Sequence, residues 1–170
     1  MKLKLRKVGV DDLPTILQLN EQGTPHVNRL ELEKIRWFAE VAAYFRVVEI
    51  GGQVAGFLIG ITPETDYPSQ YFAWFCQRYT RFVYIDRVVV ADWARRQGVG
   101  RALYQDVELF TGQLSYLLVT DVYSQPPNDI SLAFHRNYGF AEVGTQEVEN
   151  GAKVVVKFLK HPVKNRRDIS

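Results

Sequence analysis

The pattern of apolar and polar residues along the chain predicts alternating strands and helices. Apolar runs typical of strands occupy residues 3–8, 45–61 as a hairpin, 82–90, 114–123, and 141–159 as a second hairpin. Apolar residues at helical spacing occupy residues 11–20, 30–42, 100–110 and 128–140. The sequence shows no internal repeat and no low-complexity segment. This order predicts one domain built on a mixed α/β sheet.

Glycine and asparagine residues mark several ends of these elements. Gly51 and Gly52 separate two strand-like runs, and both can adopt the positive φ that a tight hairpin requires. Asn150 and Gly151 have the same place in the last pair of strands. Gly139 follows the last helical pattern, where glycine commonly ends a helix. These residues predict two hairpins and one helix end.

Two nearly continuous apolar runs, 82–90 and 114–123, are the candidates for central strands. A helix is predicted between them, so the three elements form a right-handed crossover in which the two strands are parallel. Within 82–90 only Asp86 and Arg87 are charged.

Residues 62–81 form a long connection rich in aromatic side chains, and part of it matches a short helix. Long connections in compact domains are often functional. Two interpretations are open: a wall of a substrate pocket, or plain packing and a dimer contact. Cys76, the only cysteine, lies among these aromatics and is expected to pack with them.

The composition fits one ordinary domain. The chain has 170 residues, of which 46% are hydrophobic, and a chain of this size buries about 70% of its unfolded surface. We expect a single domain over residues 1–160 and a basic polar tail over 161–170. The formal net charge of +2 falls short of the one-signed charge of a dedicated nucleic-acid binder, so no nucleic-acid partner is expected.

The single cysteine excludes an intrachain disulfide and a multi-thiolate metal site, and it suits a reducing compartment. We expect no metal. The amino terminus is basic, but acidic residues and Pro14 follow before any apolar run of signal-peptide length. No segment approaches the roughly 20 apolar residues of a membrane helix. The sequence therefore indicates a cytoplasmic protein without a membrane partner.

The apolar run 82–90 leads into the segment "ARRQGVGR", which stands just before a predicted helix. A helix start presents unpaired N–H groups and the positive end of the helix dipole, and both attract anions. Gly98 allows phosphate oxygens to approach the backbone, and Gly100 stands where alanine would favour the helix by ~1 kcal/mol. The cationic side chains nearby are Arg95, Arg96 and Arg101. A diphosphate suits such a cluster. The alternative is a glycine-containing turn with solvated arginines.

Two other phosphate-binding motifs do not fit this segment. A P-loop requires a Gly-Lys-Ser/Thr ending, which is absent. A dinucleotide fingerprint requires a third glycine and an acidic residue after the next strand. Ala102 and Leu103 stand where that glycine would be, so we set the fingerprint aside.

The run Val88-x-Val90, with Arg95 five residues later, and the motif Arg95-x-x-Gly98-x-Gly100 resemble the acyl-CoA-binding signature of the GNAT N-acyltransferase superfamily. Asn128 and the segment "FHRNYGF", which resembles Phe-Tyr-x-x-x-Gly-Phe, extend the resemblance over nearly all of the chain. The resemblance implies an α/β (α+β) fold with a mixed central sheet of about seven strands, about four flanking helices and splayed parallel central strands.

By this resemblance the cosubstrate is acetyl-CoA and the product is CoA. Backbone N–H groups from Arg96 to Arg101 would hold the diphosphate, and the pantetheine arm would lie along residues 88–90 as an added strand. Such pairing needs a strand edge without a neighbour, so the strands from Phe82 and Leu114 are expected to diverge near their carboxyl ends. The cofactor-binding residues expected are Val88, Val89, Val90, Arg95, Arg96, Gln97, Gly98, Val99, Gly100, Arg101, Asn128, Ser131 and His135.

Acetyl transfer needs a neutral amine, and an amine of the lysine type, with a pKa of ~10.4, is protonated at neutral pH. Asp86 is the candidate base, because it shares the strand face of Val88 and Val90 and burial would raise its pKa. The alternatives are a chain of water molecules as the base, and an Asp86 that pairs with Arg87 or a loop. The resemblance implies that a backbone N–H near Val90 stabilises the oxyanion.

The departing thiolate needs a proton, and the last helix offers candidates. One stripe at helical spacing carries the polar residues Asn128, Ser131, His135 and Tyr138. The residues on the roughly opposite side, expected to pack on the sheet, are Ile130, Ala133 and Phe134. His135 stands where a tyrosine is commonly the general acid in the superfamily, and an imidazole of pKa ~6.5 can protonate a thiolate. Tyr138 is the rival acid, and a hydrogen-bonded histidine without a catalytic role is the alternative for His135.

These features predict an acetyl-CoA-dependent N-acetyltransferase that acts on a primary amine of a small molecule or a peptide. Candidates for contacting that amine are His26, Asp66 and Tyr71. A homodimer is compatible with the resemblance. The main alternative is a non-catalytic acyl-CoA-binding or protein-interaction module. A third hypothesis is a nucleic-acid accessory role for the basic tail. Its residues are Lys160, Lys164, Arg166 and Arg167.

Overall fold

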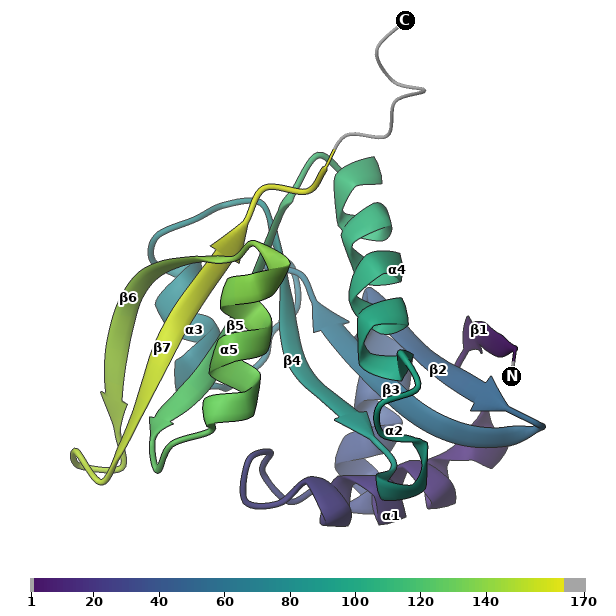
Figure 1. The fold of residues 1–170 in the computed structure, drawn as a ribbon. Helices are drawn as coiled ribbons and strands as arrows, with labels where there is room; N and C mark the ends of the chain where they lie inside the picture. Colours follow the sequence, from purple (N-terminus) through teal and green to yellow (C-terminus); the bar gives the residue numbers. More distant parts are fainter. Residues whose placement is uncertain (1, 164–170) are drawn as a thin grey trace, which may run out of the picture.

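The computed structural model describes residues 2–163, which form a seven-stranded mixed sheet with helices on both faces (Figure 1). The strands are β1 (Leu3–Lys7), β2 (Tyr44–Ile50), β3 (Gln53–Ile61), β4 (Phe82–Val90), β5 (Leu117–Gln125), β6 (Ala141–Val148) and β7 (Lys153–Lys160). The α-helices of this part are α1 (Leu13–Gly23), α2 (Leu32–Val41), α3 (Gln70–Cys76), α4 (Val99–Gln113) and α5 (Asp129–Tyr138). Two single-turn 3-10 helices, Val10–Asp12 and Asp92–Ala94, precede α1 and α4.

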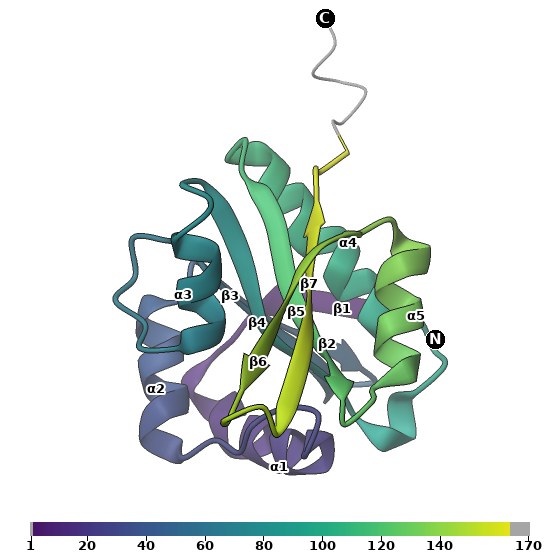
Figure 2. The same cartoon turned by 90° about the vertical axis from the view of Figure 1, so that its left-hand side faces the viewer.

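The strand order is β1-β2-β3-β4-β5-β7-β6, and every neighbouring pair is antiparallel except β4 and β5. The predicted parallel crossover through α4 is therefore confirmed. Figure 2 shows α2 and α3 on one face of the sheet, α4 and α5 on the other, and α1 at its lower end. The helix α1 packs against α2, β3 and β4. Because both faces are covered, β3 and β4 are buried almost throughout, as their apolar sequences predict.

The predicted turns and helix ends agree with the structure. Gly51 and Gly52 form the β2–β3 turn with φ of 59° and 81°, and Gly139 ends α5 with φ of 113°. The described part of the chain has five α-helices rather than about four. The additional helix is α3, because Ser69 caps it and two apolar residues one turn apart, Phe72 and Phe75, anchor it in the core.

Most of the aromatic connection packs inside the protein. Phe72 and Phe75 lie against Tyr84 with ring centroids 5.7 and 5.6 Å apart. Trp74 covers Gly144 of β6 so closely that a Cβ there would stand 2.7 Å from the indole. The prediction that Cys76 packs among these rings is wrong, since its thiol is exposed. Cys76 ends α3 outside the helix face that reaches the core.

The two central strands are paired only over their first halves. The pairs run from Phe82 with Leu117 to Ile85 with Thr120, and the Thr120 hydroxyl donates a 2.9 Å hydrogen bond to the Ile85 carbonyl at the last pair. Figure 1 shows the strands diverging beyond this point. The predicted divergence is confirmed. Among residues 2–163, the edge of residues 86–90 that faces β5 has no strand partner.

The carboxyl-terminal prediction can be followed as far as residue 163. Lys160 is the last residue of β7 and forms an ion pair with Glu108 of α4, so it is not a free cation of a tail. Lys164, Arg166 and Arg167 lie outside the described residues. No helix within residues 2–163 combines the length and the apolar character that crossing a membrane requires.

Candidate active site

The helix α4 begins within the predicted glycine and arginine segment. Gly98 precedes the helix with φ of 81° and ψ of 12°, a left-handed conformation that glycine adopts without strain. The first backbone bond of the helix runs from Ala102 N to Gly98 O at 3.0 Å. The N–H groups of Val99, Gly100 and Arg101 therefore lie before the first helical hydrogen bond and are free to bind an anion at the helix end.

The space beside these two glycines is open. A Cβ at Gly98 would meet no described atom within 4 Å, and a Cβ at Gly100 would meet only Val90 Cγ2 at 3.8 Å. Packing among the described residues therefore does not require glycine at position 100, where alanine would favour the helix. A ligand that approaches the backbone at this point would explain the glycine, because a side chain there would obstruct the approach.

The arginines of the segment are exposed around the same helix start. Arg95 pairs with Asp92 at 2.9 Å, and both side chains are about two-thirds exposed, at 66% and 65%. Arg96 has φ of 63°, so a second left-handed residue shapes the turn. The Arg101 guanidinium lies 5.9 Å from the centroid of the Tyr138 ring. Gln97 donates a 3.2 Å hydrogen bond to the carbonyl of Trp93.

The free edge of β4 leads directly to this helix start. Val88 and Val90 are half-buried, and Val90 faces Gly100 of α4. Val89 is buried on the other face, where its Cγ2 would lie 3.3 Å from a Cβ on Gly23 of α1. The alternation thus places Val88 and Val90 on the face of α4.

Asp86 does not share that face, and the prediction that it does is wrong. Ile59 lies opposite Arg87 and Gly60 lies opposite Ile85, so Asp86 is one extra residue, a β-bulge in β4. A bulge interrupts the alternation of side chains. Asp86 and Arg87 consequently both contact residues on the face of α1, α2 and α3.

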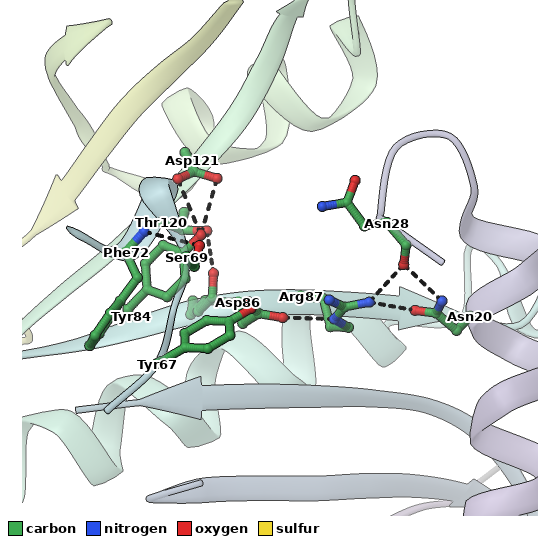
Figure 3. Close-up of polar contacts among 11 residues, drawn as sticks. Asn20, Asn28, Tyr67, Ser69, Phe72, Tyr84, Asp86, Arg87, Thr120 and Asp121 are labelled. Atoms are coloured by element: carbon green, nitrogen blue, oxygen red, sulfur yellow. Dashed lines mark hydrogen bonds and ion pairs between the residues drawn. The ribbon is translucent and has the colours of Figure 1, made fainter. Parts of the chain in front are cut away.

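Both carboxylate oxygens of Asp86 are engaged (Figure 3). Tyr67 donates its hydroxyl proton to Oδ1 at 2.6 Å, and Arg87 Nε donates to Oδ2 at 2.7 Å. Arg87 Nη1 donates in turn to the Asn20 side chain at 3.0 Å and to the Asn28 carbonyl at 2.8 Å. Pairing with Arg87, the alternative left open by the sequence, is therefore what the structure shows for Asp86. The network ties the loop between α1 and α2 to β4.

A second carboxylate, Asp121, faces the same divergence and was missed from the sequence. It follows Thr120 on β5 just as Asp86 follows Ile85 on β4, so both acids stand at the first position beyond the last strand pair. Its Oδ2 accepts hydrogen bonds from Lys157 Nζ at 3.0 Å and from the Tyr84 hydroxyl at 3.2 Å. Burial raises the pKa of Asp121, and Lys157 opposes this rise.

His135 of α5 is enclosed in the core. Its ring stacks on Phe158 of β7 at 5.4 Å between centroids. Nδ1 donates a 2.7 Å hydrogen bond to the carbonyl of Ser131, and since a carbonyl only accepts, this assigns the ring proton to Nδ1. Nε2 therefore accepts the 2.6 Å hydrogen bond from the Tyr104 hydroxyl. Burial lowers the pKa of His135 to about 4, so the ring is neutral at neutral pH.

These features can be compared with known proteins. The profile described as "Acetyltransferase (GNAT) family" matches residues 13–140. The chain belongs to the GNAT acetyltransferase family. Members of this family use acetyl-CoA to acetylate amines. No curated protein sequence matches this GNAT chain.

Solved structures agree in fold with this GNAT chain. Ard1 from Thermoplasma volcanium has a TM-score of 0.77 at 16% identity, with 96% of this chain and 100% of that chain covered. The ribosomal-protein-alanine N-acetyltransferase from Brucella melitensis has 0.71 at 24% identity, covering 93% and 99%. The yncA protein from Salmonella typhimurium, solved with its cofactor acetyl-CoA, has 0.72 at 17% identity, covering 97% and 96%.

The residues of this GNAT acetyltransferase fit the cosubstrate of the family. A diphosphate needs N–H donors, positive charge and room for its oxygens. The start of α4 offers all three, in the N–H groups before the first helical bond, the exposed arginines and the open space beside Gly98 and Gly100.

The helix α5 departs from its predicted orientation in this GNAT chain. Asn128 caps it, accepting a 3.4 Å hydrogen bond from the Ser131 N–H. Ile130 is 86% exposed and Ala133 is exposed, so the prediction that they pack on the sheet is wrong. His135 packs there instead, because Ser131 and Tyr104 satisfy both of its nitrogens. Phe134, the third residue of the predicted packing side, is half-buried.

Tyr138, the rival acid, is half-buried between α5 and α4. Its hydroxyl donates a 3.1 Å hydrogen bond to Glu108 of α4. Burial raises the pKa of Tyr138, and the negative charge of Glu108 raises it further, so the side chain remains a phenol at neutral pH.

The structure separates the three candidates for amine contact. Tyr71 reaches the strands that diverge, since its hydroxyl lies 2.9 Å from the hydroxyl of Tyr123 on β5. His26 is exposed in the loop between α1 and α2. Asp66 lines a different hollow of about 510 Å³ beside α2, together with Trp37.

Proposed function

We propose that this GNAT acetyltransferase transfers the acetyl group of acetyl-CoA directly to a primary amine of a small molecule or a peptide. The observation that carries the proposal is one arrangement: the unpaired edge of residues 86–90 joins the open helix start of α4, and two carboxylates face the divergence beside it. Acetyl-CoA supplies the activated acetyl thioester. The similarity to a ribosomal-protein-alanine N-acetyltransferase supports including peptides among the acceptors to be tested.

The cosubstrate is held in our proposal by backbone groups more than by side chains. The N–H groups of residues 96–101 bind the diphosphate, with Arg95, Arg96 and Arg101 supplying positive charge. The polar groups of residues 88–90 that face β5 bind the amide groups of the pantetheine arm, since they have no strand partner among the described residues. Asn128 and Ser131 at the start of α5 complete this binding surface, and His135 supports it from the core.

Asp121 is the better placed of the two carboxylates to accept the amine proton. Each oxygen of Asp86 accepts a short bond, from Tyr67 or Arg87. Asp121 Oδ1 has only a 3.4 Å contact with the Tyr84 hydroxyl and keeps capacity to accept another proton donor. Burial raises the pKa of Asp121, which suits a base that works near neutral pH. As the amine nitrogen forms its bond to the acetyl carbon and the carbon–sulfur bond breaks, the amine proton passes to Asp121.

The proton that the thiolate takes is assigned to Tyr138 rather than to His135. His135 is neutral, and its single ring proton is used in the bond to Ser131. Tyr138 is half-buried and has one 3.1 Å bond to Glu108, so its hydroxyl can turn to another acceptor more easily. His135 then supports α5 from within the core.

A non-catalytic acyl-CoA-binding module is the second candidate. It is favoured by one observation: the two side chains first expected to move protons, Asp86 and His135, both have their hydrogen-bonding atoms engaged. Such a module would bind the cosubstrate without releasing thiol.

Two measurements test the proposal. Calorimetry should show binding of acetyl-CoA and of CoA to the purified chain, and a thiol-release assay should show turnover with at least one member of a panel of free amino acids, polyamines and short peptides. If neither acetyl-CoA nor CoA binds at high micromolar concentration, the proposal is wrong. Binding without thiol release across the panel would favour the non-catalytic module.

A further inference from the structure

Lys157 on β7 is a lysine whose side chain is fully buried, with 0% exposed. Its Nζ donates hydrogen bonds to Asp121 Oδ2 at 3.0 Å and to the backbone carbonyl of Tyr71 at 3.2 Å. Three rings surround the ammonium, with centroids 5.5, 5.3 and 5.0 Å from Nζ. They belong to Tyr71, Trp74 and Phe75 of α3. The group has no direct part in the proposed acetyl transfer.

Packing alone does not account for a charge at this position. An apolar side chain of the same length, such as methionine, would fill the same space between β7 and α3. A buried ion pair generally stabilises a fold no better than well-packed apolar residues of similar volume, because both charges lose their hydration. The role of the charge on Lys157 therefore has to be sought in its ion pair with Asp121.

That partner is fixed by the sheet. Asp121 and Lys157 lie directly opposite each other in the antiparallel pairing of β5 with β7. Side chains at opposite positions on one face of such a pair are close neighbours. The ammonium thus meets the carboxylate at the point where β5 has just left β4.

The groups that face Asp121 oppose one another. Burial and the negative charge of Asp86 on β4 raise the pKa of Asp121, whereas Lys157 and the hydrogen bond from Tyr84 on β4 lower it. Arg87 already pairs with Asp86, and Tyr71 on α3 is uncharged. Burial lowers the pKa of Lys157, and so does the positive charge of Arg78, which follows α3, whereas Asp121 raises it. Within residues 2–163, Lys157 is the one cation that bonds to Asp121.

We propose that Lys157 is a positioning residue that keeps Asp121 ionised and holds its carboxylate at the divergence of β4 and β5. This inference rests on the proposed function, in which Asp121 accepts the amine proton. A residue that only filled the core would affect stability and leave the pH dependence of catalysis where it was. A residue that sets the charge of Asp121 moves that dependence.

The test is the variant Lys157→Met, which keeps the length of the side chain and removes its charge. Loss of the cation disfavours the Asp121 carboxylate, so a higher pH is needed to form the base. The acid limb of kcat/KM for the best amine of the panel should move upward by at least about one pH unit. The affinity for acetyl-CoA should stay that of the wild type. A folded variant with an unmoved acid limb overturns the proposal.

Arg46→Met is the matched control. Arg46 lies on β2 and forms its own ion pair with Asp106 of α4 at 2.9 Å, at 32% and 22% side-chain exposure, and neither residue takes part in the proposed acetyl transfer. Removing that cation should leave the acid limb at its wild-type position. A shift of equal size in both variants would overturn the specific role of Lys157.

A second measurement covers the case in which Lys157→Met does not fold. In the wild type, the Asp121 carboxyl carbon and the Lys157 Nζ nitrogen can be followed by NMR during a pH titration. Interacting groups titrate in two macroscopic steps that the signals of both groups report, so the Lys157 signal should also shift across the pH range in which the Asp121 carboxyl titrates. A Lys157 signal that stays constant across that range would contradict the proposal. This titration needs no turnover, so its outcome is separate from a failure of the wild type to bind acetyl-CoA or to release thiol.

Discussion

The substitution Gly100→Ala should stabilise the protein and weaken its binding of acetyl-CoA. Gly100 is the second residue of α4, and a Cβ there would lie 3.8 Å from Val90 Cγ2, an ordinary contact. Alanine is favoured over glycine in a helix by up to about 1 kcal/mol, which raises the midpoint of thermal unfolding by about 2–4 °C in a domain of this size. The fold therefore tolerates the methyl group.

This methyl group should, however, weaken the binding of acetyl-CoA. If the diphosphate lies against the backbone of Gly100, the methyl group enters a filled space, at a cost of about 1–3 kcal/mol. This corresponds to about 5- to 150-fold weaker binding. Thermal unfolding followed by circular dichroism and calorimetry with acetyl-CoA measure the two effects separately.

The matched control is Gly112→Ala near the other end of the same helix. A Cβ there would lie 3.4 Å from Pro162 Cβ, and the position is remote from the helix start. This variant should gain helix stability with unchanged affinity. A Gly100→Ala protein that binds acetyl-CoA as tightly as the wild type would refute the diphosphate site, and a destabilised one would refute the open geometry of the helix start.

Three further predictions follow from the same structure. Gly98→Glu should abolish acetyl-CoA binding in calorimetry, because the glutamate carboxylate would repel the diphosphate. A non-glycine residue at φ of 81° should also cost about 1–2 kcal/mol of stability, which lowers the melting temperature. Undiminished binding would contradict the proposed diphosphate site. Burial lowers the pKa of His135 to about 4 in the folded protein, whereas the pKa of an unfolded histidine is about 6.5. As the pH falls below about 6.5, the unfolded chain therefore binds this proton before the folded protein does. The free energy of unfolding should consequently decrease by about 2 kcal/mol between pH 7 and about pH 5 because of His135. Denaturant unfolding at both values tests this, and an equal loss in His135→Gln would show that other groups cause it. Asp121→Asn should lower kcat/KM for the amine by about 10²-fold or more with acetyl-CoA affinity retained, and wild-type turnover in this variant would remove Asp121 from the mechanism.

The elements and the helix start at Gly98 could be predicted because they depend on local sequence. Apolar runs and helical periods give the strands and helices, and glycines mark the turns that need positive φ. The helix start at Gly98 is visible for the same reason, since a strand, two glycines and a helix follow one another without interruption. The divergence of β4 and β5 followed only from the family resemblance.

The face of Asp86 could not be predicted, because it depends on pairing between strands. The extra residue in β4 is defined by its register with β3, where Ile59 lies opposite Arg87 and Gly60 lies opposite Ile85. Strict alternation within one strand places Asp86 on the wrong face. Asp121 is an acidic residue in the apolar run of β5, just as Asp86 is in that of β4, so the sequence did offer it as a candidate site residue. Its partner Lys157 lies 36 residues away in the sequence, and only the pairing of β5 with β7 shows that the two side chains meet.

The burial of His135 could not be predicted from the sequence either. A stripe of polar residues on a helix predicts a sheltered polar surface, and the stripe does face inward. What decides the role of His135 is Tyr104, which lies 31 residues earlier on α4 and accounts for Nε2. Once both nitrogens are satisfied, an imidazole can be buried among aromatic rings, and the apolar Ile130 is left exposed.

The most direct test of the cosubstrate site is an amide NMR titration of the wild-type protein with CoA. The largest shifts are predicted for the N–H signals of residues 96–101 at the start of α4 and for those of residues 86–90 that face β5. If CoA leaves both sets of signals unmoved, or shifts mainly residues elsewhere, the cosubstrate does not bind at this edge and helix start.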